Sequence, residues 1–136
     1  MLSKDILCPC GKNQNLYKDC CQLIHQDIYK AITSEDLMRS RYSAFVLCNG
    51  EYLLQSHSSE YRNPSTIQHT IQWAKSVAWN RLEIISKSNG NFNDTEGTVE
   101  FKAYFKEKNK LDVIHENSYF IKENNHWVYD KELSYN

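Results

Sequence analysis

The sequence has little proline or glycine, with two prolines and four glycines among its 136 residues. This scarcity excludes collagen-like chains and disordered chains rich in proline and glycine. An excess of charge of one sign is also missing, since the formal net charge is -1. No global positive field therefore draws the protein onto nucleic acid or an anionic membrane. What is present is the composition of a globular domain, with 12% aromatic residues to build its core.

Long apolar runs are absent as well. No stretch approaches the roughly 18 residues that suggest a transmembrane helix, and residues 1–7 are too short and too polar for a secretion signal. We therefore expect a cytoplasmic protein without membrane insertion. A chain of 136 residues has room for one ordinary domain and a small appended module.

Cysteine is unevenly distributed, because four of the five cysteines lie in the segment CPCGKNQNLYKDCC, residues 8–21. Zinc prefers four tetrahedral ligands, and a closed set of four thiolates is the usual mark of a structural site. Two alternatives fit less well. Vicinal cysteines cannot form a disulfide without backbone strain, and the Cys-x-x-Cys pair of redox proteins is missing. We predict one Zn2+ as cofactor, bound by Cys8, Cys10, Cys20 and Cys21.

The next segments have helical signals. Residues 23–32 predict a weak helix, and Thr33 followed by acidic residues predicts the start of a stronger one that ends near Asn49-Gly50. A shorter helix is expected over residues 51–57. After Asn63-Pro64 breaks the chain, Ser65 is a candidate cap for a further helix with an apolar face.

From residue 82 the apolar period changes from helical to alternating. Val99, Phe101, Ala103 and Phe105 alternate with polar residues, as in a strand with one buried face. Asn89-Gly90 and Asn124-Asn125 are turn signals. They separate predicted strands at 82–88, 98–107, 112–123 and 126–131. Helices followed by an antiparallel sheet predict an α+β fold with the helices on one sheet face.

Two resemblances sharpen this prediction. The cysteine segment resembles the SEC-C motif, a zinc-binding element known from the C-terminal tail of the SecA translocation ATPase. LMRSRYSAF at 37–45, His-Glu-x-Ser-x-Phe at 115–120 and Trp-x-Tyr at 127–129 resemble the YchJ-like (UPF0225) family of bacterial proteins. The resemblance implies a SEC-C zinc module over residues 1–25, followed by an NTF2-like domain over residues 26–136, in which helices pack on a curved antiparallel sheet to form a cone.

Four polar residues are candidates for ligand binding. Arg39 and Arg41 lie two positions apart in a predicted helix and so on different faces. Each either pairs with a carboxylate, such as Glu116 or Glu100, or binds an anionic ligand inside the cone. His115 and Glu116 point to opposite faces of their strand, so they do not form an acid–base pair. A His-Glu-x-x-His zinc motif is incomplete here, and we expect no catalytic metal.

Three functions are compatible with these features. The closed four-cysteine site favours a binding or adaptor protein, whose zinc module contacts a protein partner while the larger domain holds a ligand or a second partner. The alternative is a small-molecule isomerase or hydrolase that uses the pocket of the NTF2-like domain, although no catalytic dyad is evident. Nucleic-acid binding through Lys4, Lys12 and Lys18 is possible but disfavoured by the near-neutral charge.

Overall fold

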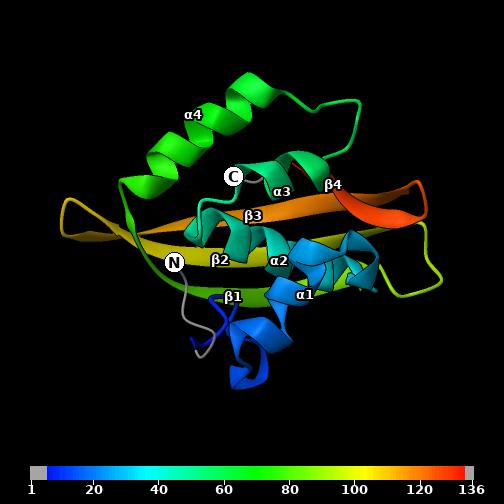
Figure 1. Cartoon of the computed structure of the whole chain (residues 1–136), viewed down its shortest axis with the longest axis horizontal. Helices are drawn as coiled ribbons and strands as arrows, with labels where there is room; N and C mark the ends of the chain where they lie inside the picture. The colour runs from blue at the N-terminus through cyan, green and yellow to red at the C-terminus, as the bar shows by residue number, and fades with distance from the viewer. Residues whose placement is uncertain (1–5, 134–136) are drawn as a thin grey trace.

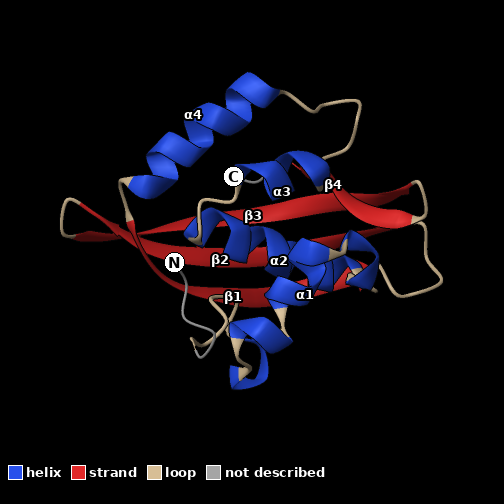
Figure 2. Cartoon of the chain, in the orientation of Figure 1, coloured by secondary structure: helices blue, strands red, loops and turns tan. Residues whose placement is uncertain are grey.

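The computed structural model describes residues 6–133, which fold into a layer of helices over a single sheet (Figure 2). Predictions for residues 1–5 and 134–136, among them the one for Lys4, lie outside the described residues. The helices are α1 (Cys21–Gln26), α2 (Ser34–Val46), α3 (Gly50–Gln55) and α4 (Pro64–Lys75). The strands are β1 (Ala78–Asn89), β2 (Glu96–Glu107), β3 (Lys110–Glu123) and β4 (His126–Leu133).

The sheet is an antiparallel meander with the strand order β1-β2-β3-β4. Its tight turns use residues that tolerate positive φ, including the predicted Asn89-Gly90 (φ 56 and 80) and Asn124-Asn125 (φ 52 and 69). The turn at Lys108-Asn109 (φ 53 and 65) lies in the gap between the predicted strands 98–107 and 112–123, although its residues were not named as a turn signal. Irregularities in register, at two places in β1 and at Asp130 of β4, bend the strands, as bulges do, and help to curve the sheet.

The helices cover one face of the sheet (Figure 1). On β2 the predicted alternation is confirmed, because Val99, Phe101, Ala103 and Phe105 are all buried beneath them. The segment after α3 adds to the edge of β4, where Ser58 donates to the Tyr129 carbonyl at 2.7 Å. This contact closes one end of the space between helices and sheet.

The start of α2 is the best-predicted helix boundary. Thr33 accepts a hydrogen bond from the Asp36 amide at 3.1 Å, and the Asp36 carboxylate accepts one from the Thr33 amide at 3.3 Å. This reciprocal pair is a capping box. The Ser34 amide also donates to the Gly90 carbonyl at 2.9 Å, so the beginning of α2 is held against the turn between β1 and β2.

Other predicted helix boundaries were wrong. The helix expected over 23–32 is divided, because Asp27 is extended (φ -153) and its side chain accepts from Tyr29 to start a short turn at Ile28–Lys30. Asn49-Gly50 starts α3 instead of only ending α2, since the Asn49 side chain caps α3. Asn63, not Ser65, caps α4, and Pro64 is well placed at the first helical position.

Candidate metal centre and binding cavity

The four predicted cysteines converge at the N-terminus. Their Sγ atoms all lie within 4.8 Å of one another, and the Sγ atoms of Cys10 and Cys20 are 3.7 Å apart. Four thiolates at about 2.3 Å from a tetrahedral zinc lie about 3.8 Å from each other. The arrangement therefore fits a four-coordinate metal ion, and all five cysteines of the chain are free of disulfides.

Local backbone geometry brings the two cysteine pairs together. The Cys8 amide donates to the Asn15 carbonyl at 2.9 Å, and an isolated bridge between Leu7 and Leu16 aligns the two sides of the loop. Gly11 takes φ 75, a left-handed conformation that glycine adopts without the penalty of a Cβ atom. The chain then returns with Cys20 directly before α1 and Cys21 as the first residue of that helix.

The electrostatics of the cluster differ among its thiols, because the pKa values of Cys8 and Cys20 are lowered and those of Cys10 and Cys21 are raised. Hydrogen bonds with Cys10 and Cys21 hold the pKa of Cys8 far below its ordinary value, whereas hydrogen bonds with Cys10 and Cys20 raise the pKa of Cys21. A hydrogen bond with Cys21 is the main cause that lowers the pKa of Cys20 to about 7. The crowded thiols thus stabilise charge on some sulfurs, and the thiolate is the form that binds metal.

A buried histidine attaches the cysteine segment to the larger domain. His25 Nε2 donates to the Ser40 carbonyl at 2.8 Å, and its Nδ1 accepts from the Tyr17 hydroxyl at 2.7 Å. Burial lowers the pKa of His25, which keeps the ring neutral and supports this pattern of one donor and one acceptor. The His25 ring also packs on Tyr52, at 4.6 Å between centroids. The sequence analysis missed this residue, because its partner Ser40 lies in another helix.

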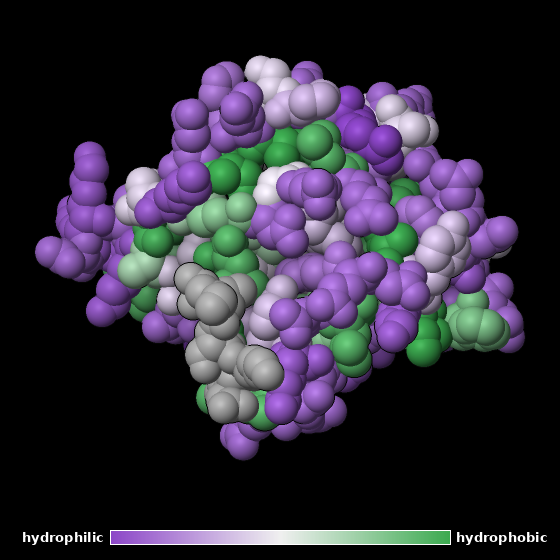
Figure 3. Space-filling model, in the orientation of Figure 1, coloured by the Kyte–Doolittle hydropathy of each residue, from purple (hydrophilic) through white to green (hydrophobic). Residues whose placement is uncertain are grey.

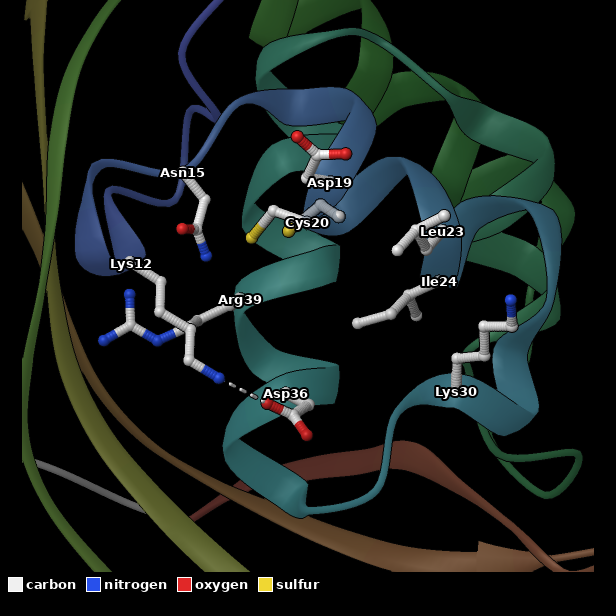
Figure 4. Close-up of a pocket in the computed structure, with 10 residues that line it drawn as sticks. Lys12, Asn15, Asp19, Cys20, Leu23, Ile24, Lys30, Asp36 and Arg39 are labelled. Carbon is white, nitrogen blue, oxygen red and sulfur yellow. Dashed lines mark hydrogen bonds and ion pairs between the residues drawn. The ribbon is translucent and has the colours of Figure 1, made fainter.

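Beside the cysteines, a groove of about 190 Å³ lies between α2 and the loop that carries the four cysteines (residues 8–21, the metal loop) (Figure 4). Lys12 reaches across it to Asp36 at 3.3 Å, whereas Leu23 and Ile24 lie on its other side. Arg39 joins the two walls, since its Nη1 donates to the Cys10 carbonyl and its Nε to Glu35, both at 2.8 Å.

The four ligand-binding candidates do not converge. Arg39 belongs to the groove, and His115 lies on the outer face of the sheet, 2.7 Å from the Glu100 carboxylate. Only Arg41 and Glu116 line a common cavity, of about 300 Å³, between the helices and the sheet. Of the carboxylates proposed as arginine partners, Glu116 forms no ion pair with an arginine within residues 6–133, whereas Glu100 accepts from His115.

Sequence reasoning also missed two polar residues of this cavity, His57 and Tyr129. His57 follows α3 and Tyr129 lies on β4, and their rings contact edge-on at 5.2 Å. They meet because the backbone after α3 pairs with β4, which no local pattern signals. The only available hint was the Trp-x-Tyr string at 127–129, whose spacing places both aromatic side chains on one strand face.

Of the two described lysines near the cysteines, Lys12 has an ion pair. Lys12 is engaged by Asp36, which raises the pKa of this lysine through its charge. Lys18 is exposed, and Lys4 is not among the described residues. No described helix is long and apolar enough to cross a membrane.

Comparison with known proteins matches residues 33–132 to the family model described as YchJ, middle NTF2-like domain. A UPF0225 protein from Shewanella sp. (strain ANA-3) is 37% identical to this chain, over 96% of the chain and 82% of the relative. A UPF0225 protein from Vibrio vulnificus (strain YJ016) is 38% identical, over 90% of the chain and 71% of the relative.

Two solved structures are similar to the whole fold. The solution structure of a SEC-C motif containing protein from Rhodopseudomonas palustris superimposes with a TM-score of 0.83 at 27% identity, covering 96% of this chain and all of that one (100%). The crystal structure of a SEC-C motif containing protein from Psychrobacter arcticus gives 0.79 at 34% identity, covering 100% and 88%. These similarities extend to the cysteine segment as well as to the helices and sheet.

Proposed function

The chain belongs to the UPF0225 (YchJ-like) family, and from this membership we propose that it is a zinc-binding adaptor, whose SEC-C module contacts a protein partner while its NTF2-like domain binds a ligand or a second partner. The observation that carries the proposal is the closed cluster of four cysteines. A zinc ion with four protein ligands has no open position for a substrate, so its role is structural.

The surroundings of the cluster support a contact surface. The metal loop and α2 border the groove lined by Lys12 and Leu23, and the side chain of Leu23 is partly exposed there (39%). A metal that shapes the loop therefore also shapes this surface. The free cysteines suit a reducing compartment, which supports a cytoplasmic location.

Metal analysis tests the zinc proposal. Protein purified under reducing conditions is expected to contain about one zinc per chain. Cys20→Ser with Cys21→Ser should abolish this binding, because a metal site needs its full set of thiolates. Cys48→Ser is the matched control, since Cys48 lies outside the cluster. Full zinc content in the double variant would refute the assignment of the ligands.

Partner capture tests the adaptor proposal separately. Proteins that co-purify with the chain should be lost from the Cys20→Ser, Cys21→Ser variant and retained by the Cys48→Ser variant. The reason is that the groove beside Cys20 needs the folded metal loop. An unchanged set of partners in the double variant would contradict a role of the module in protein contact.

The alternative, an isomerase or hydrolase, has a narrower basis. His57 and Glu116 are titratable and line the cavity of about 300 Å³ between the helices and the sheet, which is the large cavity. Within residues 6–133, however, no hydrogen bond connects either of them to a serine or threonine hydroxyl that could act as a nucleophile. Binding is therefore better supported than catalysis.

A further inference from the structure

The large cavity contains a buried arginine without a counter-charge. Arg41 is only 6% exposed, and it forms no ion pair with any carboxylate among residues 6–133. Its Nη1 donates to the Leu53 carbonyl at 2.9 Å and to the Ser56 hydroxyl at 2.7 Å. These acceptors are neutral, so the charge itself is not compensated, and burying a charge in this way is costly.

The remaining donors of Arg41 are available to a ligand. A guanidinium has five N–H donors, and only Nη1 hydrogen-bonds within the described part of the chain. The guanidinium carbon also lies 4.8 Å from the Tyr129 ring centre and 6.0 Å from that of Phe45. These cation–π contacts help to hold the group, while Nε and Nη2 have no hydrogen-bond acceptor within residues 6–133 and suit bidentate binding of an oxyanion.

Among residues 6–133, Arg41 is also the only permanent cation that lines the cavity. Burial lowers its pKa to about 10, which still leaves the group charged at neutral pH. Burial also lowers the pKa of His57, so this ring is neutral there. Burial raises the pKa of Tyr129 to about 12, so its hydroxyl keeps its proton and can donate. A single cation neutralises a ligand that carries one negative charge, whereas a phosphate dianion would keep one charge uncompensated.

The rest of the cavity fits an apolar body. Phe45, Ile67 and Phe101 line it, and Glu116 stands at its junction with a second cavity of about 190 Å³. The second cavity shares Phe45 and Phe101 and ends at the paired rings of Trp73 and Trp79, 5.6 Å apart. Apolar side chains continue to the surface between α4 and α3, where Figure 3 shows hydrophobic residues grouped.

We propose that the NTF2-like domain binds a small organic monocarboxylate, with the carboxylate on Arg41 and its apolar tail directed past Phe101 toward Trp79. The proposal deepens the ligand-binding part of the proposed function and rests on it. It requires no role for the metal module. The combined cavities exceed twice the roughly 150 Å³ that accommodates a benzene ring, so a phenyl group on a short acid chain fits the space.

The test uses the full, zinc-loaded chain and two probes, 4-phenylbutyrate and its neutral amide. Binding is followed by nuclear magnetic resonance of the tryptophan indole N–H groups. The acid should cause saturable shifts at Trp73 and Trp79, and only weaker shifts at Trp127, which does not line the cavities. The amide should bind at least about tenfold more weakly, because it brings no charge to Arg41.

Variants check the assignment to Arg41. Arg41→Met should lower the affinity for the acid at least about tenfold and bring it to that of the amide. Arg81→Met is the matched control, since Arg81 is exposed and stacks on Tyr104 outside the cavity, and it should bind like wild type. Because Arg41 also ties α3 to α2, Arg41→Lys provides a variant that keeps the charge; it should discriminate acid from amide less strongly than wild type.

Each outcome has a distinct meaning. Equal affinities of wild type for acid and amide would overturn the carboxylate proposal, while leaving the domain as a ligand-binding one. Absence of saturable shifts with either probe would overturn the proposal and the ligand-binding part of the proposed function together. Neither result would affect the contact of the metal module with a partner.

Discussion

At the scale of single residues, the two charged groups of the cavity are stabilised in different ways. Arg41 has neutral acceptors and two aromatic faces. Glu116 has no ion pair within residues 6–133, and burial, aided by the nearby charge of Glu132, raises its pKa. The folded protein therefore holds a proton on Glu116 more tightly than the unfolded chain does.

The raised pKa of Glu116 predicts how the stability of the folded protein changes with pH. Between the ordinary carboxyl pKa and the raised value, the folded state binds more protons than the unfolded state, so stability decreases as pH rises through this window. Glu116→Gln removes the buried carboxylate and therefore this loss of stability. We expect the variant to have a higher midpoint of urea unfolding than wild type at pH 7 and no advantage below about pH 4.

The matched control for this prediction is Glu60→Gln, because Glu60 is exposed. It should stay within about 0.5 kcal/mol of wild type at both pH values. A Glu116→Gln protein that unfolds more easily than wild type at pH 7 would mean that the carboxylate is stabilised by a contact that glutamine cannot replace.

At the scale of elements, the turn between β1 and β2 positions the start of α2. Gly90 has φ 80 and accepts from the Ser34 amide through its carbonyl. A Cβ atom on Gly90 would lie 1.9 Å from the Ser34 Oγ atom and 2.8 Å from its Cβ. The turn and the helix thus require glycine both for the backbone conformation and for the close approach.

Gly90→Ala is therefore expected to reduce the free energy of unfolding by at least about 2 kcal/mol, through strain at positive φ and the clash with Ser34. Gly50→Ala is the comparison, since its Cβ would meet Ile71 at an ordinary 3.6 Å. That variant should remain within about 1 kcal/mol of wild type. Urea unfolding monitored by circular dichroism measures both, and equal stability of the two variants would show that the contact with Ser34 relaxes without cost.

At the scale of the whole molecule, the metal module and the NTF2-like domain share one hydrophobic core. Cys10 and Cys21 are both 1% exposed and belong to the same cluster of buried residues as Leu37 and Leu53. His25 adds hydrogen bonds that span the two parts. A boundary at residues 25 and 26 remains a prediction, since the packing is continuous across it.

Removal of the metal tests how independent the two parts are. A chelator should abolish hydrogen-exchange protection of the amides of α1 and the cysteine loop, because metal binding of this type supplies on the order of 10 kcal/mol to local folding. Protection in β2 and β3 should persist, since their ladders do not involve the module. Simultaneous loss of protection in the sheet would contradict a two-part organisation, and the Cys48→Ser protein should respond like wild type.

Features carried by neighbouring residues were determined by the sequence alone. The four clustered cysteines lie within residues 8–21, the capping box of α2 spans Thr33 to Asp36, and the alternation of β2 is a property of one strand. The order of helices and strands and the α+β class followed from such local patterns. Each depends on periodicity or spacing, which the chain retains whatever its tertiary packing.

Only the tertiary structure decided which polar residues meet. Arg39 and Arg41 are equivalent in the sequence, yet one holds the metal loop and the other faces the cavity. The cavity joins residues from α2, α4, β2, β3 and β4, which are far apart along the chain. Contacts of this kind depend on how helices pack on a curved sheet, because the burial and partners of a charged side chain are set by its neighbours in space and not by those in sequence.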